Sequence, residues 1–190
     1  MLTAVQITRR VEEAFGGGVV KAAMLEGGHP WVSIGVEHWV QVARFLRDDP
    51  QIRLDGLRCI TGLDYPDKSQ LCAAYDLLSF EFQHEFCVKV FVERPALPTL
   101  PEIPSVADIW RAAEWHEREA FDLLGINFPG NPDSVTDEFT GQTLTHPRRI
   151  LLPDDWVGYP LRKDYQFPKE YEGIPGSVEM DWAQKPNYPK

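Results

Sequence analysis

The chain has 190 residues, of which 43% are hydrophobic and 12% aromatic, so it suits one folded domain with length left for an extension. Its net charge of −10 excludes a nucleic-acid binder, which needs a cationic surface, and disfavours direct adsorption to anionic lipid. No stretch approaches the roughly 18–20 apolar residues that span a bilayer, and no secretory core precedes the first arginines. We therefore expect a protein on the cytoplasmic side, held at any membrane by other proteins.

Residues 1–94 predict an α+β domain. In chain order, the expected elements are a helix over 3–15, strands over 19–25 and 31–36, a helix over 37–47, and strands over 57–61, 71–80 and 84–93. The last strand alternates strictly, with Phe86, Val88 and Val90 on one side, which is typical of a sheet with one face on the core. Residues 71–80 are apolar on both faces, as a central strand would be. The order of elements indicates a small mixed or antiparallel sheet covered by helices.

Residues 95–128 predict a proline spacer followed by a long helix. Four prolines between Pro95 and Pro104 cannot continue a ladder of hydrogen bonds. Ser105 and Asp108 then resemble a capping box, which opens a helix that runs to about Leu124. The expected apolar stripe of this helix is Ile109, Ala113, His116, Ala120 and Leu123, and Gly125 ends it.

Residues 129–190 predict an extended arm. Nine of the sixteen prolines lie between Pro129 and Pro189, a density that prevents regular structure. The same stretch holds eight large aromatic residues, which gain most when they are buried. We therefore expect this arm to lie on the surface of a partner protein and to bury its rings there.

The cysteines predict no metal or iron–sulfur site. Cys59, Cys72 and Cys87 are widely spaced and form no C-x-x-C pair, so this chain alone could not assemble a cluster or a zinc knuckle. All three lie in apolar or strand-like stretches and are expected to be small buried residues with reduced thiols.

No other motif predicts a reaction centre. The glycines at 16–18 follow a helix and precede a strand, which is the reverse of the order in a dinucleotide site or P-loop. There is no G-x-S-x-G motif, and no cysteine has a neighbouring base. The isolated histidines, for which surface or packing roles are expected, are His29, His38 and His84.

The long helix carries a dense cluster of charges. Glu114 with Arg118, and Arg118 with Asp122, are spaced as i,i+4 pairs that can neutralise each other. Three interpretations remain: a metal or acid–base site of a stand-alone enzyme that uses Glu117, Glu119 and Asp122, a solvated salt-bridged face, or a charged docking face. The docking face is favoured, because a di-metal carboxylate centre needs Glu-x-x-His motifs on two helices.

Two further stretches combine arginines with aromatic residues and leucines. They are 148–156, with sequence RRILLPDDW, and 159–165, with sequence YPLRKDY. Such combinations are common anchors in protein interfaces. An anion site is the alternative, but neither stretch has the glycine-rich loop before a helix that would hold a phosphate.

Together these motifs resemble a known family. Glu117-Arg118-Glu119-x-x-Asp122, followed downstream by Pro160-Leu-Arg-Lys-Asp-Tyr165, closely resembles the C-subunit family of respiratory complex I, the NADH-quinone oxidoreductase. The strong resemblance covers about residues 105–167, and the N-terminal region agrees only in its layout. One departure is that residues 133–145 form an insert between the turn at Phe128–Pro132 and the arginine pair. Either Asn131 replaces the histidine usual in this turn, or His146 is its shifted counterpart.

The resemblance implies a cofactor-free structural subunit of a hetero-oligomer. It would lie beside the D subunit, with the B and I subunits near, in the peripheral arm that passes electrons from NADH to quinone. FMN, the iron–sulfur clusters and quinone would belong to other subunits, and the complex would translocate protons at the cytoplasmic face of the cell membrane. The alternative is a homologous subunit of a membrane-bound hydrogenase or a ferredoxin-linked complex. The residues expected to contact partners are Glu117, Arg118, Glu119, Asp122, Arg148, Arg149, Trp156, Pro160, Leu161, Arg162, Lys163, Asp164 and Tyr165.

Overall fold

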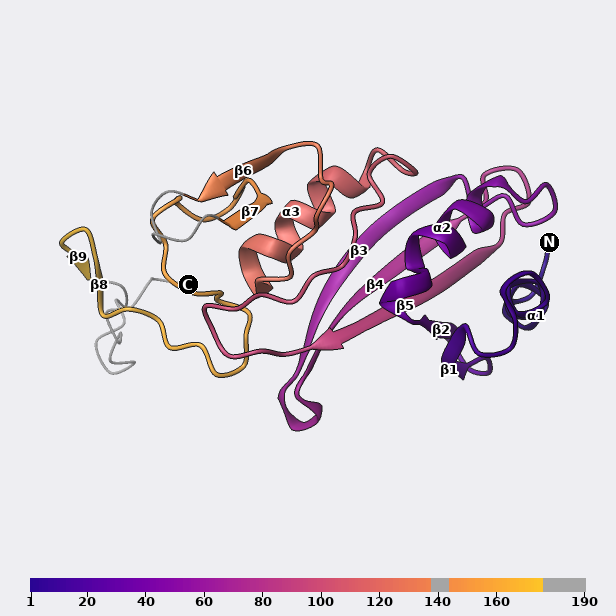
Figure 1. Cartoon of the computed structure of the whole chain (residues 1–190), viewed down its shortest axis with the longest axis horizontal. Helices are drawn as coiled ribbons and strands as arrows, with labels where there is room; N and C mark the ends of the chain where they lie inside the picture. The colour runs from indigo at the N-terminus through magenta and orange to yellow at the C-terminus, as the bar shows by residue number, and fades with distance from the viewer. Residues whose placement is uncertain (138–143, 176–190) are drawn as a thin grey trace, which may run out of the picture.

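The computed structural model describes residues 1–137 and 144–175. A five-stranded sheet and α1 and α2 make up the N-terminal half, and α3 lies against the edge of this sheet (Figure 1). The segment after α3 continues away from the sheet, at the end of the molecule opposite the N-terminus (Figure 1). The predicted α+β class is confirmed.

The sheet is mixed. Its strands are β1 (Val20–Met24), β2 (Trp31–Ile34), β3 (Gly56–Tyr65), β4 (Gln70–Leu78) and β5 (Glu85–Glu93). Their order is β1-β2-β5-β4-β3, with β2 parallel to β5 and every other pair antiparallel. β4 is therefore an interior strand, as its apolar faces predicted. Phe86, Val88 and Val90 of β5 are buried as predicted, but Cys87 on the opposite side of the strand is buried as well.

Two helices and the core confirm the predicted N-terminal elements. α1 (Ala4–Phe15) begins at a capping box formed by Thr3 and Gln6. A short 3-10 turn (Val36–His38) leads into α2 (Trp39–Asp48), and the Trp39 ring packs on the sheet with its centroid 4.3 Å from that of Tyr75.

The third helix is shorter than predicted. α3 runs from Ala113 to Leu124, and residues 105–112 form turns. The capping box expected at Ser105 is wrong, because the Ser105 hydroxyl donates to Glu117 instead. Trp110 is drawn into the core, where its indole N–H donates to the Leu54 carbonyl at 2.9 Å. These tertiary contacts outweigh the helical preference of the segment.

The expected apolar stripe of α3 is also incomplete. Ala113 and Ala120 are buried as predicted, but His116 and Leu123 are only half-buried. The charged Glu117 and Asp122 are fully buried in their place. Gly125 ends the helix in the left-handed conformation with φ 67°, as predicted. α3 packs closely on β3 at Gly62. A Cβ at this position would clash with the Leu124 side chain, so the glycine permits the close approach.

The segment after α3 is partly packed on the chain itself. β6 (Ser134–Asp137) and β7 (Leu144–Pro147), which begin inside the insert, pair antiparallel, and β8 (Glu170–Tyr171) pairs with β9 (Ile174–Pro175). Tyr159 is 8% exposed and belongs to the main core, so the expectation that every ring of the arm needs a partner's surface is wrong for this residue. Trp182 and Tyr188 lie outside the described residues. Within the described ranges, no helix has the length and apolar character required to cross a membrane.

Candidate functional site

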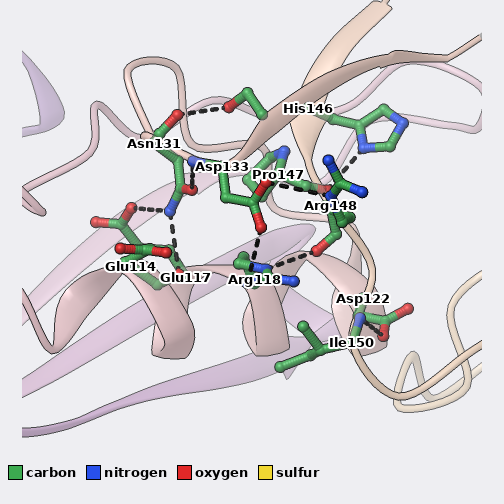
Figure 2. Close-up of polar contacts among 11 residues, drawn as sticks. Glu114, Glu117, Arg118, Asp122, Asn131, Asp133, His146, Pro147, Arg148 and Ile150 are labelled. Atoms are coloured by element: carbon green, nitrogen blue, oxygen red, sulfur yellow. Dashed lines mark hydrogen bonds and ion pairs between the residues drawn. The ribbon is translucent and has the colours of Figure 1, made fainter.

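The charged motif of α3 points toward the segment that follows the helix, so its contacts lie within the chain. Glu117, Arg118 and Asp122 come from successive parts of one helix face and meet residues between Asn131 and Leu152 (Figure 2). All three side chains are buried.

The Glu117 carboxylate binds residues that precede α3 and a residue that follows it. Its Oε2 accepts from the Ser105 hydroxyl at 2.6 Å and from the Asn131 amide at 2.8 Å. Its Oε1 accepts from the Val106 backbone N–H at 2.8 Å. The Asn131 amide also donates to the Glu114 carbonyl at 3.1 Å (Figure 2). One carboxylate thus joins the turn before α3 to the turn after it.

Arg118 holds the insert and the arginine pair. Its Nη1 lies 2.9 Å from Asp133 Oδ2, and its Nε donates to the Arg148 carbonyl at 3.0 Å (Figure 2). The guanidinium also lies over the Trp115 ring, 4.5 Å from its centroid. The i,i+4 pairs expected with Glu114 and Asp122 are absent from the ion pairs of the described residues, because tertiary partners take their place.

Asp122 binds four groups of the segment after α3 through its two carboxylate oxygens. Its Oδ1 lies 2.8 Å from Arg149 Nη1. Its Oδ2 accepts three successive backbone N–H groups, from Ile150 at 3.0 Å, Leu151 at 2.7 Å and Leu152 at 3.0 Å. Three amides converging on one oxygen form an anion-binding concavity, which an internal carboxylate fills here. The backbone after Arg149 is therefore wrapped around this side chain.

Arg162 binds the carboxyl end of α3. Its Nε donates to the Leu124 carbonyl at 2.8 Å, and the Leu161 backbone N–H donates to the Leu123 carbonyl at 3.0 Å. A cation at this end complements the helix dipole, and α3 has no basic residue of its own in its last turn. Burial and the charge of Arg94 lower the pKa of Arg162.

A separate ion pair holds the next residues against the sheet. Arg94 at the end of β5 lies 2.7 Å from Asp64 of β3 and also pairs with Asp164. These hydrogen bonds raise the pKa of Arg94 and lower that of Asp164. Asp64 Oδ2 accepts from the Lys163 backbone N–H at 2.8 Å. The Lys163 side chain itself is exposed.

The thirteen predicted contact residues therefore divide into two groups. Glu117, Arg118, Asp122 and Arg162 are buried, and the Arg149 side chain is nearly so, with polar groups bound inside the chain. Contact with a partner stays a prediction for the residues that remain accessible. Those exposed are Glu119, Arg148, Leu161, Lys163 and Asp164, and those half-buried are Trp156, Pro160 and Tyr165.

The metal site considered for Glu117, Glu119 and Asp122 does not fit this geometry. The oxygens of Glu117 and Asp122 are already bound to hydrogen-bond donors, and Glu119 is exposed. Within the described ranges, the carboxylates of α3 are absent from the groups whose ligand atoms lie close enough to hold a metal ion. The buried charged residues of the motif hold different segments of this chain together, and we call these contacts clamps.

Several residues of this site were not singled out from the sequence. The sequence pattern predicts only a helix cap at Ser105, and Asp64, Arg94 and Asp133 belong to no recognisable motif. No sequence signal marks these partners, because they follow from the burial of three charged side chains of α3, and the sequence does not show that burial.

The turn before the insert keeps both sequence alternatives open. Asn131 contacts the motif through Glu117, whereas the His146 ring stacks on Phe121 with centroids 4.4 Å apart. Both therefore pack on α3, one turn of the helix apart. β6 lies between these two residues in the sequence, and His146 itself belongs to β7, where it pairs with Val135.

The buried Glu117 carboxyl gives the site a pH dependence. Desolvation raises its pKa above the ordinary value of 4.5, although hydrogen bonds from Ser105, Val106 and Asn131 oppose the shift. A raised pKa in the folded state means that the protonated form contributes stability below the unfolded-state pKa, and this contribution is lost as the pH rises through the folded-state pKa.

Glu117→Gln removes this titration. We expect the difference in free energy of unfolding, wild type minus Glu117→Gln, to fall as the pH rises from below 4.5, measured by urea denaturation at a series of pH values. Glu119→Gln removes the same formal charge from an exposed position of α3 and should stay within about 0.5 kcal/mol of wild type at neutral pH. A difference for Glu117→Gln that is constant with pH would contradict the assignment.

Comparison with known proteins agrees with the resemblance of the motifs. Residues 32–171 match the sequence model of the family described as "Respiratory-chain NADH dehydrogenase, 30 Kd subunit". A relative from Chlorobium phaeobacteroides, named as the C subunit of NADH-quinone oxidoreductase, is 37% identical over 86% of this chain and 89% of its own length. A relative of the same name from Roseiflexus sp. is 34% identical over 95% and 94%. A third, from Chloroherpeton thalassium, is 44% identical, and the match spans about half of its length, 51%.

The fold also occurs in a solved structure. A chain of the membrane-bound sulfane sulfur reductase, described as an archaeal respiratory membrane complex, matches with a TM-score of 0.60 and covers 85% of each chain. At 21% identity this match supports the fold alone. The family match covers most of the chain, from residue 32 to the end of β8. The chain therefore belongs to the family of the 30 kDa subunit of the respiratory-chain NADH dehydrogenase, whose relatives are named as the C subunit of NADH-quinone oxidoreductase.

Proposed function

We propose that this chain is a structural subunit of the peripheral arm of a proton-translocating NADH-quinone oxidoreductase, without a redox cofactor or an active site of its own. The observation that carries the proposal is the division of the motif into buried clamps and outward-facing side chains. The clamps hold residues 148–165 on α3 and the sheet, and large apolar side chains in and just after this segment are left facing outward.

Four large apolar side chains between residues 151 and 167 face solvent. They are Leu151, Val157, Leu161 and Phe167, with exposed fractions of 59%, 85%, 54% and 64%. Single exposed apolar residues are common, but four within one short segment favour a protein interface. The backbone that carries the first three of these is held by Asp122 and Arg162, so this part of the interface would be largely preformed. Preformed interfaces avoid part of the entropic cost of association.

The principal partner we propose is the D subunit of the complex, with the B and I subunits nearby, at the cytoplasmic face of the cell membrane. In this arrangement the chain supports electron transfer from NADH to quinone by holding the subunits that carry FMN and the iron–sulfur clusters. The relatives named as the C subunit of NADH-quinone oxidoreductase support this choice. A permanent partner would also stabilise the folded form of this chain by mass action.

A second candidate is the equivalent subunit of a membrane complex with another electron donor. The observation in its favour is the fold shared with a chain of the sulfane sulfur reductase complex. Quinone reduction by the purified assembly would separate the two: activity with NADH supports the first candidate, and activity only with ferredoxin or hydrogen supports the second.

The interface is tested by the double variant Val157→Asp/Leu161→Asp, expressed together with the other subunits of the complex. We expect the variant chain to be lost from the purified complex, because two carboxylates would have to be desolvated in the interface. Both side chains are more than half exposed, so the isolated chain should unfold at nearly the wild-type temperature.

The matched control is Val5→Asp on α1, an apolar side chain of 52% exposure at the other end of the molecule (Figure 1). This control should co-purify normally. Co-purification of the double variant at wild-type levels would refute the interface. Deletion of residues 146–190 would be less informative, because it also removes Arg149 and Arg162 from the chain's own clamps.

A further inference from the structure

The sheet brings together side chains that the sequence left isolated. Asp76 of β4 is paired in register with Cys59 of β3 on one side and with Cys87 of β5 on the other. Directly paired residues of neighbouring strands project from the same face of a sheet. His29 lies in the turn between β1 and β2, two residues before Trp31, which is the β2 partner of Cys87. These four residues therefore gather at one end of one face.

The polar atoms of this group converge. His29 Nε2 lies 3.1 Å from Asp76 Oδ1, and Cys59 Sγ lies 3.3 Å from Asp76 Oδ2. One ligand atom each from His29, Asp76 and Cys87 lies within 4.8 Å of the other two. Tetrahedral zinc with bonds of about 2.0–2.3 Å places its ligand atoms about 3.3–3.8 Å apart. Small side-chain rotations would bring this group to that spacing.

We propose that His29, Asp76 and Cys87 bind a zinc ion, with water in the fourth position. Imidazole nitrogen, thiolate sulfur and carboxylate oxygen are the three ligand types that protein zinc sites use. Calcium and magnesium prefer oxygen ligands throughout, so the thiol argues against them. Within residues 1–137 and 144–175, this is the group of potential ligands that meets the spacing.

The surroundings are compatible with a cation. The group lies in a small surface cavity that is also lined by Arg58 and Glu85, and these two side chains pair with each other. The arginine charge is thereby neutralised beside the site. Binding of Zn²⁺ would release the thiol proton of Cys87 to solvent. Thiolate and carboxylate would then balance the two positive charges of the ion.

Two features make the ligands easy to assemble. Cys59 donates to the second oxygen of Asp76 and can orient the carboxylate, as outer-shell partners do at metal sites. The His29 side chain is 62% exposed, so it can rotate without disturbing the core.

A disulfide is not an alternative use of these cysteines. Cys59 and Cys87 flank Asp76 on its two sides, so two strand spacings of about 4.8 Å separate their backbones. A disulfide requires Cα atoms no more than about 7 Å apart. All three cysteines of the chain are free thiols in the structure.

The test is titration of the full-length reduced chain with Co²⁺, which reports its ligands by absorption. We expect one Co²⁺ per chain, visible absorption of a tetrahedral ion, and a thiolate-to-cobalt band in the near ultraviolet that Zn²⁺ abolishes. His29→Asn, a change at an exposed position that leaves the fold intact, should weaken binding at least about 100-fold, since even outer-shell changes cost 10–100-fold.

Cys87→Ser should remove the thiolate band, whereas Cys72→Ser on the same face of β4 should keep it. The proposal is overturned if the wild-type chain binds no stoichiometric Co²⁺, or if His29→Asn and Cys87→Ser bind it with unchanged affinity and spectrum. Thermal unfolding of each metal-free variant separates loss of the site from loss of the fold. The result is independent of the proposed function, because co-purification of the subunits is a different measurement.

Discussion

Replacing Asp122 with alanine is expected to lower the free energy of unfolding by about 3–5 kcal/mol, the cost of removing one partner of a buried ion pair. The variant leaves the Arg149 guanidinium without its carboxylate, and the backbone N–H groups of Ile150, Leu151 and Leu152 without their acceptor. Asp122 is fully buried and the Arg149 side chain is only 9% exposed, so water replaces these contacts poorly.

Two measurements check this effect. Urea denaturation gives the loss of stability, and hydrogen exchange should show faster exchange at the amides of residues 150–152 before the rest of the chain responds. Glu119→Ala, at an exposed position of the same helix, should change stability by no more than about 0.5 kcal/mol. Equal, small effects of the two substitutions would show that the Asp122 contacts contribute little to the fold.

Arg162→Ala is expected to destabilise the chain by about 2–4 kcal/mol, while its neighbour Lys163→Ala should cost less than about 0.5 kcal/mol. From the sequence, either cation could be the anchor. The structure assigns this role to Arg162, which is buried over the Tyr159 ring and donates to the Leu124 carbonyl. The exposed Lys163 contributes through its backbone N–H, which alanine retains.

The comparison of these two neighbours is its own control, because both substitutions remove one positive charge from adjacent positions. Thermal and urea unfolding of the purified chain measure the difference. Arg162→Lys should recover only part of the loss, since an ammonium cannot keep both the planar stacking and the Nε contact of the guanidinium. A larger loss for Lys163→Ala than for Arg162→Ala would contradict the assignment.

The contacts of Asp122 and Arg162 give a physical reason for the charged residues of the motif in this chain. Asp122 and Arg162 both satisfy backbone groups, one at the N–H groups after Arg149 and the other at the carbonyls that end α3. A segment rich in proline cannot satisfy its polar groups through helices or sheets, so side chains have to do so. The expected consequence is a rigid segment in an irregular conformation.

Local patterns in the sequence determined most of the N-terminal domain. The alternation in β5, the glycines after α1 and Gly125 after α3 act over a few residues, so they predict the elements correctly. The motif between Glu117 and Tyr165 is equally visible, because family membership depends on residue identity and spacing. Its exposure was not visible, and charges expected on a surface are buried.

Only the tertiary structure decided which distant groups meet. Three contacting pairs are far apart in the sequence: Asp122 and Arg149 by 27 residues, Asp64 and Lys163 by 99, and His29 and Asp76 by 47. Periodicity carries no information at such separations, since the register of the strands and the path of the chain after α3 set these pairs. For the same reason the helix predicted from Ser105 begins only at Ala113. Trp110 packs in the core, and the Ser105 hydroxyl donates to the buried Glu117 carboxylate.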